Sequence, residues 1–215
     1  MSREILHIPC GFRCYTKKML RNKFNIKQAS LPFDSGFFTP LSIIKFMEND
    51  VKINLGNTNP CIKTENFIKD EKKGIKFEEV NYNLINEFIK ENGYRNSHLD
   101  STEGYYTLIK KYEFVLAHYN WSPISNKEIT NPKKNIEIIN ETFNRRKIRL
   151  LELINNSSQI NLYLYTQGNL FLQINRYRSI NRIYNIKDDF LLLENYFKNR
   201  FPNKKIKTIY LDQCA

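Results

Sequence analysis

Cys14 is the residue of this chain whose position is best suited to nucleophilic chemistry. It follows an apolar stretch at 4–9 and a glycine, Gly11, and it stands at the start of a segment with helical spacing. A helix N-terminus offers unpaired backbone N–H groups and a partial positive charge, which lower the pKa of a thiol. The same N–H groups can receive an oxyanion during acyl transfer. We therefore take Cys14 as the candidate nucleophile, with Gly11 and Arg13 as candidate substrate-binding residues.

The spacing of the cysteines argues against two other roles. Cys10 and Cys14 are separated by three residues, so they do not form a CxxC redox motif, and no second pair is present to complete a zinc site. We expect no metal and no cofactor. One alternative stays open, because a free cysteine is often a buried side chain that only fills space.

A cysteine nucleophile needs a base, and the chain has three histidines. His7 lies within the first predicted strand, where we expect it to pack in the core. His98 lies in a polar stretch typical of a loop. His118 comes at the end of an aromatic and β-branched run, so a strand would carry it to the sheet edge where a strand-end cysteine also lies. We therefore choose His118 as the candidate base.

Basic residues outnumber acidic ones, 34 to 22, which gives a formal net charge of +12. The densest cluster is Arg145, Arg146, Lys147 and Arg149, and a second lies at 204–207. One interpretation is that this positive charge results from the codon bias of an AT-rich genome and lies on a solvated surface. Another is a non-enzymatic protein whose basic helix binds nucleic acid or another anionic partner. In a third, Arg145 and Arg146 hold a phosphate or carboxylate of a small substrate.

Strands and helices are predicted to alternate at both ends of the chain. The predicted strands are 4–9, 51–55, 75–77, 112–119, 160–166 and 206–211, and the predicted helices are 14–23, 40–47, 83–90, 132–155 and 188–201, with 170–184 a further possible helix. Turns are predicted at Asn59-Pro60 and Lys73-Gly74, and Asn92-Gly93 is predicted to end the helix at 83–90. The apolar stripe of the helix at 132–155 comprises Ile136, Ile139, Phe143, Leu150, Leu151 and Ile154.

This alternation predicts an α/β fold, with a central mixed sheet covered by helices on both faces. The length of 215 residues favours a single domain over 1–215, with an irregular excursion at about 51–105. No apolar run approaches the roughly 18 residues of a membrane span. The first residues also lack the apolar region of a secretory signal. We therefore expect a cytoplasmic protein that does not enter the membrane.

Two motifs resemble those of a family of papain-like cysteine peptidases of unknown function. The first is Gly11-Phe12-Arg13-Cys14, and the second is Leu31-Pro32-Phe33-Asp34. Family members have Gly-x-x-Cys after a first strand, a Pro-Phe-Asp-Trp loop, and a later histidine before an arginine-rich helix. Here the histidine matches His118 and the helix matches 143–150, whereas Ser35 replaces the tryptophan. The resemblance covers most of 5–50 and 114–166.

The resemblance implies a papain-like fold and cysteine-dependent hydrolysis of a peptide, an amide or another acyl substrate. Papain-like enzymes place the cysteine first in the chain, then the histidine, then an Asn or Asp that orients the imidazole. Cys14 and His118 follow that order. Asp34 is our choice for the third residue because it belongs to the motif, and Asn120 and Asp212 are the alternatives.

Overall fold

The computed structural model describes residues 4–10, 15–34, 36, 38–49, 58–65, 75–79, 105–116, 132–165 and 186–211. Three predicted elements, the strand at 51–55 and the helices at 83–90 and 170–184, lie outside the described residues. Within them the chain is a mixed α/β structure, as predicted. No described helix is both long enough and apolar enough to cross a membrane.

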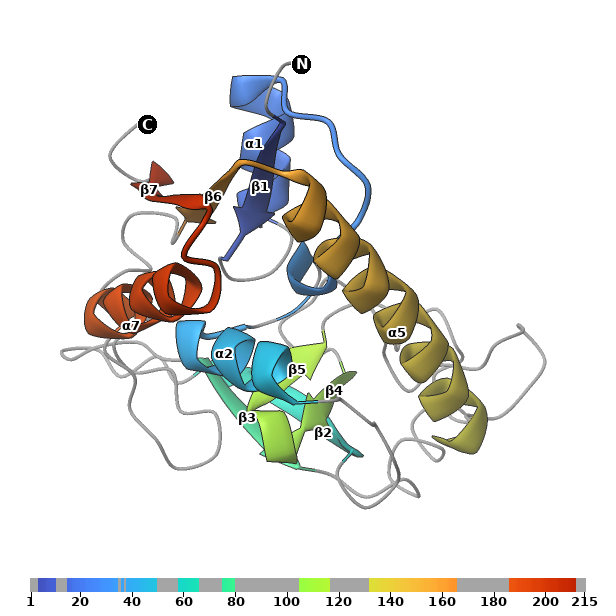
Figure 1. The fold of residues 1–215 in the computed structure, drawn as a ribbon. Coiled ribbons are helices and arrows are strands. Elements are labelled where there is room, and N and C mark those ends of the chain that lie inside the picture. Colours follow the sequence, from blue (N-terminus) through green and yellow to red (C-terminus); the bar gives the residue numbers. More distant parts are fainter. Residues whose placement is uncertain are drawn as a thin grey trace, which may run out of the picture.

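Three strands that are distant in sequence form a parallel sheet (Figure 1). They are β1 (Ile5–Pro9), β6 (Gln159–Leu164) and β7 (Lys205–Tyr210), in the order β1-β6-β7. The register pairs His7 with Asn161 and Asn161 with Lys207. Because all three strands are parallel, their carboxyl ends meet at one edge of the sheet. Ligands of open α/β sheets gather at such an edge.

A second, antiparallel sheet is formed by the middle of the chain. It contains β2 (Thr58–Glu65), β3 (Ile75–Glu79), β4 (Tyr105–Ile109) and β5 (Phe114–Leu116), in the order β3-β2-β4-β5. A short 3₁₀ turn, η3 (Lys110–Tyr112), separates β4 from β5. The described strands therefore form two sheets rather than the single mixed sheet that we predicted.

Four helices and one 3₁₀ turn complete the described structure. The helices are α1 (Tyr15–Phe24), α2 (Pro40–Glu48), α5 (Pro132–Asn156) and α7 (Ile186–Arg200), and the 3₁₀ turn is η1 (Pro32–Asp34). The start of α2 confirms the predicted cap, because Thr39 Oγ1 accepts a hydrogen bond from the Ser42 N–H and Pro40 is the first helical residue. Leu20 of α1 belongs to a small apolar cluster with Tyr163 and Leu211, whereas α7 and α2 pack in the main core.

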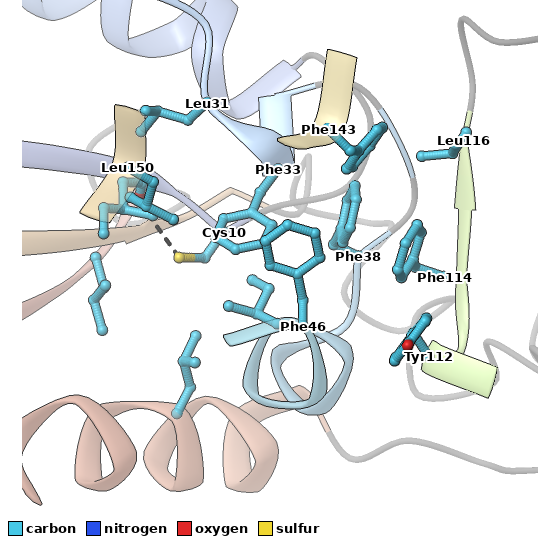
Figure 2. Close-up of a cluster of buried hydrophobic side chains, with 14 of the residues drawn as sticks. Cys10, Leu31, Phe33, Phe38, Phe46, Tyr112, Phe114, Leu116, Phe143 and Leu150 are labelled. Carbon is cyan, nitrogen blue, oxygen red and sulfur yellow. Dashed lines mark hydrogen bonds between the residues drawn. The ribbon is translucent and has the colours of Figure 1, made fainter. Parts of the chain in front are cut away.

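One apolar cluster joins the two sheets. It includes Leu6 and Ile8 of β1, the three residues of β5, and five residues of the predicted stripe of α5. Figure 2 shows the aromatic part of this cluster, where Phe33 and Phe38 lie between Cys10 and Phe114. The rings of Phe38 and Phe114 stack with centroids 4.7 Å apart. The sixth residue of the predicted stripe, Leu151, is exposed instead.

Two predictions in the middle of the chain are wrong. Asn59 and Pro60 lie inside β2 rather than in a turn. Pro60 pairs with Thr107 of β4, and the pairing of β2 with β3 reaches only to Cys61, so Pro60 has a described neighbour on one side alone. A strand tolerates proline where no ladder bond is required of its nitrogen. Tyr112 belongs to η3, so the strand predicted from that residue begins at Phe114.

Candidate functional site

The segment after α1 folds into a buried turn that contacts several other elements. We call Ser30–Asp34 together with Gly36 the motif turn, because it contains the Leu-Pro-Phe-Asp motif. Pro32, Phe33 and Asp34 are all buried. The proline fixes its own φ and disfavours helix at Leu31, so α1 cannot continue through this segment. The buried Phe33 then anchors the turn in the main core.

Asp34 attaches the motif turn to α1. Its Oδ2 forms an ion pair with Lys17 Nζ and accepts a hydrogen bond from the Leu31 N–H at 2.9 Å. The Asp34 side chain is 2% exposed, and no described residue donates a hydrogen bond to its other oxygen, Oδ1. Burial raises the pKa of the Asp34 carboxyl, and the positive charges of Lys17 and Arg146 oppose that rise.

Gly36 attaches the same turn to β5. A Cβ at this position would lie 2.7 Å from the carbonyl oxygen of Val115 and 2.8 Å from the Phe38 ring. Only glycine lets the two backbones approach this closely. The motif turn therefore contacts α1 at Lys17 and β5 at Val115.

The basic residues of α5 bind the segments around the motif turn. Arg149 donates a hydrogen bond to the Ser30 carbonyl at 2.8 Å, and Arg146 lies close enough to Asp34 to affect its pKa. Lys147 donates to the carbonyl of Asn49, the residue that caps α2. These contacts give the cluster a structural role inside the chain. Arg145 is exposed.

Cys10, at the end of β1, is a structural cysteine. It is fully buried beside Phe33 and Leu150 in the main core, and its Sγ donates a weak hydrogen bond to the Ile8 carbonyl at 3.4 Å (Figure 2). Burial raises the pKa of the Cys10 thiol. A buried neutral thiol is a poor nucleophile, so Cys10 is not a candidate for the chemistry assigned to Cys14.

His7 does not pack in the core, contrary to our prediction. Strand side chains alternate between faces, so His7 points away from the apolar side on which Leu6 and Ile8 lie. Its Nδ1 shares a 2.8 Å hydrogen bond with the Tyr163 hydroxyl, which also accepts one from Asn161 Nδ2 at 3.3 Å. Partial burial lowers the pKa of His7.

Four predicted site residues, Gly11, Arg13, Cys14 and His118, lie outside the described residues. The described elements nevertheless begin and end close to them in sequence, because α1 begins at Tyr15 and β5 ends at Leu116. The ion pair of Lys17 with Asp34 was missed, although the absence of any acidic residue between Glu4 and Asp34 is a signal that could have indicated it. The hydrogen bond between His7 and Tyr163 joins residues 156 positions apart, and no local pattern reveals it.

Comparisons with protein-family models, with curated proteins and with solved structures found no match. Among the residues that the structure describes, no three His, Cys, Asp or Glu side chains are grouped as a metal site would require. The motif turn and the elements it contacts are therefore the features of this chain that bear on its function.

Proposed function

We propose that the chain is a cysteine-dependent hydrolase or acyl transferase that acts on an amide, peptide or thioester bond. Cys14 is the nucleophile and His118 is the base. The observation that best supports this proposal is that the motif turn contacts both α1 and β5. Lys17 follows Cys14 by three residues and pairs with Asp34, while Val115 precedes His118 by three residues and lies against Gly36. Two segments that are about a hundred residues apart in sequence thus meet at one turn.

The proposed reaction follows from the chemistry of a thiol and an imidazole. His118 takes the proton of Cys14, and the thiolate attacks the acyl carbon to form a tetrahedral oxyanion. Backbone N–H groups at the start of α1 stabilise this oxyanion. The C–N or C–S bond then breaks, His118 returns the proton to the leaving group, and an acyl-cysteine remains. Water attacks the acyl-cysteine in a hydrolase, and an acceptor nucleophile attacks it in a transferase.

Two buried polar groups that have no hydrogen-bond partner among the described residues support a site near the start of α1. The Thr16 hydroxyl is buried in the first turn of α1 with no hydrogen-bond partner among the described residues, as is Asp34 Oδ1. Proteins rarely leave such groups unsatisfied, and the exceptions are often functional. In our proposal Asp34 binds Lys17 through Oδ2 and accepts an imidazole N–H from His118 through Oδ1. Arg146, beside Asp34, is a candidate contact for an anionic part of the substrate.

An acyl-phosphonate or vinyl-sulfone probe tests the assignment of Cys14. We expect the probe to label the wild-type chain and the Cys61→Ala control, and to leave Cys14→Ala unlabelled. Tryptic mapping should place the adduct on Cys14. Labelling of Cys14→Ala at the wild-type rate would remove the proposal.

A second experiment distinguishes two possible roles of Asp34, which are to orient the imidazole of His118 and to stabilise the motif turn. Asp34→Asn keeps the shape of the side chain but removes its charge, and Lys17→Met removes the ion pair from the other side. If Asp34 orients His118, Asp34→Asn slows labelling at least tenfold and shifts its pH profile, while Lys17→Met preserves the profile. If Asp34 only supports the turn, both variants lower the melting temperature and neither shifts the profile.

A further inference from the structure

One side of the parallel sheet carries basic residues that form no ion pair with an acidic residue in the part of the chain that the structure describes. Helix α1 has exposed cations at Lys18, Arg21 and Lys23, and Lys27 follows it. No acidic residue occurs between Glu4 and Asp34, and Asp34 is buried and paired with Lys17. Every accessible charge on this helix is therefore positive.

Strand β7 adds two more cations to this side. Lys205 and Lys207 are exposed, and side chains two residues apart on a strand share a face, so both lie on the face of Ile209. Ile209 packs in the small apolar cluster with Leu20 of α1, so this is the face that α1 covers. We call Lys18, Arg21, Lys23, Lys27, Lys205 and Lys207 the α1–β7 surface. The upper part of Figure 1 shows α1 and these strands together.

Polar side chains lie between these cations. The register places His7, Asn161 and Lys207 in one row across the sheet, and Gln159 and Lys205 in the row beside it. Gln159 donates a hydrogen bond to Asn161 at 2.7 Å. This part of the sheet therefore carries fixed polar side chains, together with the exposed Ile5, which lies in the row of Gln159 and Lys205.

A general excess of lysine does not account for this arrangement. The other long helices mix both signs, since α5 carries Glu137, Glu141 and Glu152, and α7 carries Asp188 and Glu194. Several cations elsewhere have partners within the chain, since Arg149 donates to the Ser30 carbonyl, and Lys45 and Lys198 pair with Glu113 and Glu194. No residue of the α1–β7 surface forms an ion pair with a described acidic residue.

We propose that the α1–β7 surface binds the phosphate backbone of a single-stranded nucleic acid. An anionic membrane is the less suitable partner, because a helix that lies on a membrane exposes an apolar face. The apolar residues of α1, such as Leu20, are instead turned toward the sheet. Phe24, 41% exposed between Lys23 and Asn25, provides a ring on which a base can stack. This binding is independent of the chemistry proposed for Cys14.

Fluorescence anisotropy with a labelled oligouridylate of about twenty nucleotides tests the proposal. If all six cations neutralise phosphates, the logarithm of the affinity should fall with the logarithm of salt concentration with a slope of about −4. Lys205→Gln/Lys207→Gln should reduce the magnitude of that slope by about 1.4 and weaken binding at low salt at least tenfold. The matched control, Lys111→Gln/Arg200→Gln, removes two exposed cations from η3 and α7 and should bind as the wild type does.

Phe24→Ala is expected to weaken binding severalfold without changing the salt slope, because stacking involves no counterions. The proposal fails if the oligonucleotide does not bind, if binding is independent of salt, or if the control variant weakens binding as much as the β7 variant. Binding to phosphatidylserine vesicles without binding to the oligonucleotide would assign the surface to a membrane and would also overturn the proposal.

Discussion

The Asp34 carboxylate connects three segments of the chain. It accepts a hydrogen bond within its own turn, pairs with Lys17 of α1, and lies near Arg146 of α5. A buried carboxylate is costly unless it is paired, so its position constrains all three segments at once. The motif residue Asp34 thus has a structural task in addition to the catalytic one that we propose for it.

His7 is expected to make stability depend on pH. Burial lowers its pKa in the folded chain below the ordinary value of about 6.5, so the folded state favours the neutral imidazole. Its stabilising contribution is present above about pH 6.5 and is lost as the pH falls through the folded pKa. His7→Asn keeps an acceptor near the Tyr163 hydroxyl but does not titrate.

Urea unfolding of the wild type and of His7→Asn between about pH 7.5 and 4.5 measures this effect. We expect the free energy of unfolding of the wild type to fall relative to that of the variant below about pH 6.5. Parallel curves for the two proteins would show that His7 has the same pKa in the folded and unfolded chains.

Gly36→Ala is expected to displace the motif turn. The added Cβ would lie 2.7 Å from a backbone oxygen of β5, which cannot move as a flexible side chain can. We predict a loss of about 1–3 kcal/mol in the free energy of unfolding. Thermal or urea unfolding measures the loss, and an unchanged stability would mean that Gly36 and Val115 are farther apart than described.

At the scale of elements, the ends of α5 and α1 depend on specific caps. Lys204 donates to the carbonyls of Asn155 and Ser157 at the C-terminus of α5, where a cation also interacts favourably with the helix dipole. Asn25 takes a positive φ of 52° just after α1, a conformation that asparagine tolerates better than most residues.

Lys204→Met should therefore cost about 0.5–1.5 kcal/mol of stability, because it leaves the last carbonyls of α5 without this donor. The neighbouring Lys205→Met is the control, since Lys205 is exposed and has no described ion pair. Equal effects of the two substitutions in chemical denaturation would contradict the capping role.

Local patterns were sufficient for many elements and insufficient for the contacts between them. The stripe of α5 was predicted because its residues recur at three- and four-residue steps, and the Thr39-Pro40 pair marked the start of α2. Pro60 was predicted to lie in a turn because proline cannot donate a hydrogen bond to a neighbouring strand. The sequence does not show which neighbours a strand will have, and therefore does not show where such a bond is not required. The contact of Lys17 with Asp34 depends on the path of the chain after α1, and no local hydrophobic periodicity predicts that path.

At the scale of the whole molecule, the two sheets share one apolar core. Phe114 of β5 lies in the same cluster as Ile160 and Leu162 of β6, although no strand of one sheet pairs with a described strand of the other. Such a shared core should make the sheets unfold together.

Phe114→Ala tests this coupling. Removing a buried aromatic ring lowers the free energy of unfolding by about 3–5 kcal/mol. Because the core is shared, this change should also destabilise the parallel sheet. Hydrogen exchange should therefore show reduced protection of the β6 amides as well as of β4. Reduced protection of β4 with unchanged protection of β6 would mean that the sheets unfold independently.

The pH dependence of Cys14 alkylation shows whether His118 ionises the Cys14 thiol. Iodoacetamide reacts with the thiolate, so the rate follows ionisation of the sulfur. For Cys14 paired with His118, we predict an inflection well below the ordinary thiol pKa of about 8.5, and its return toward that value in His118→Asn. An inflection at or above about 8.5 in the wild type, unchanged in His118→Asn, would show that Cys14 and His118 are not a catalytic pair.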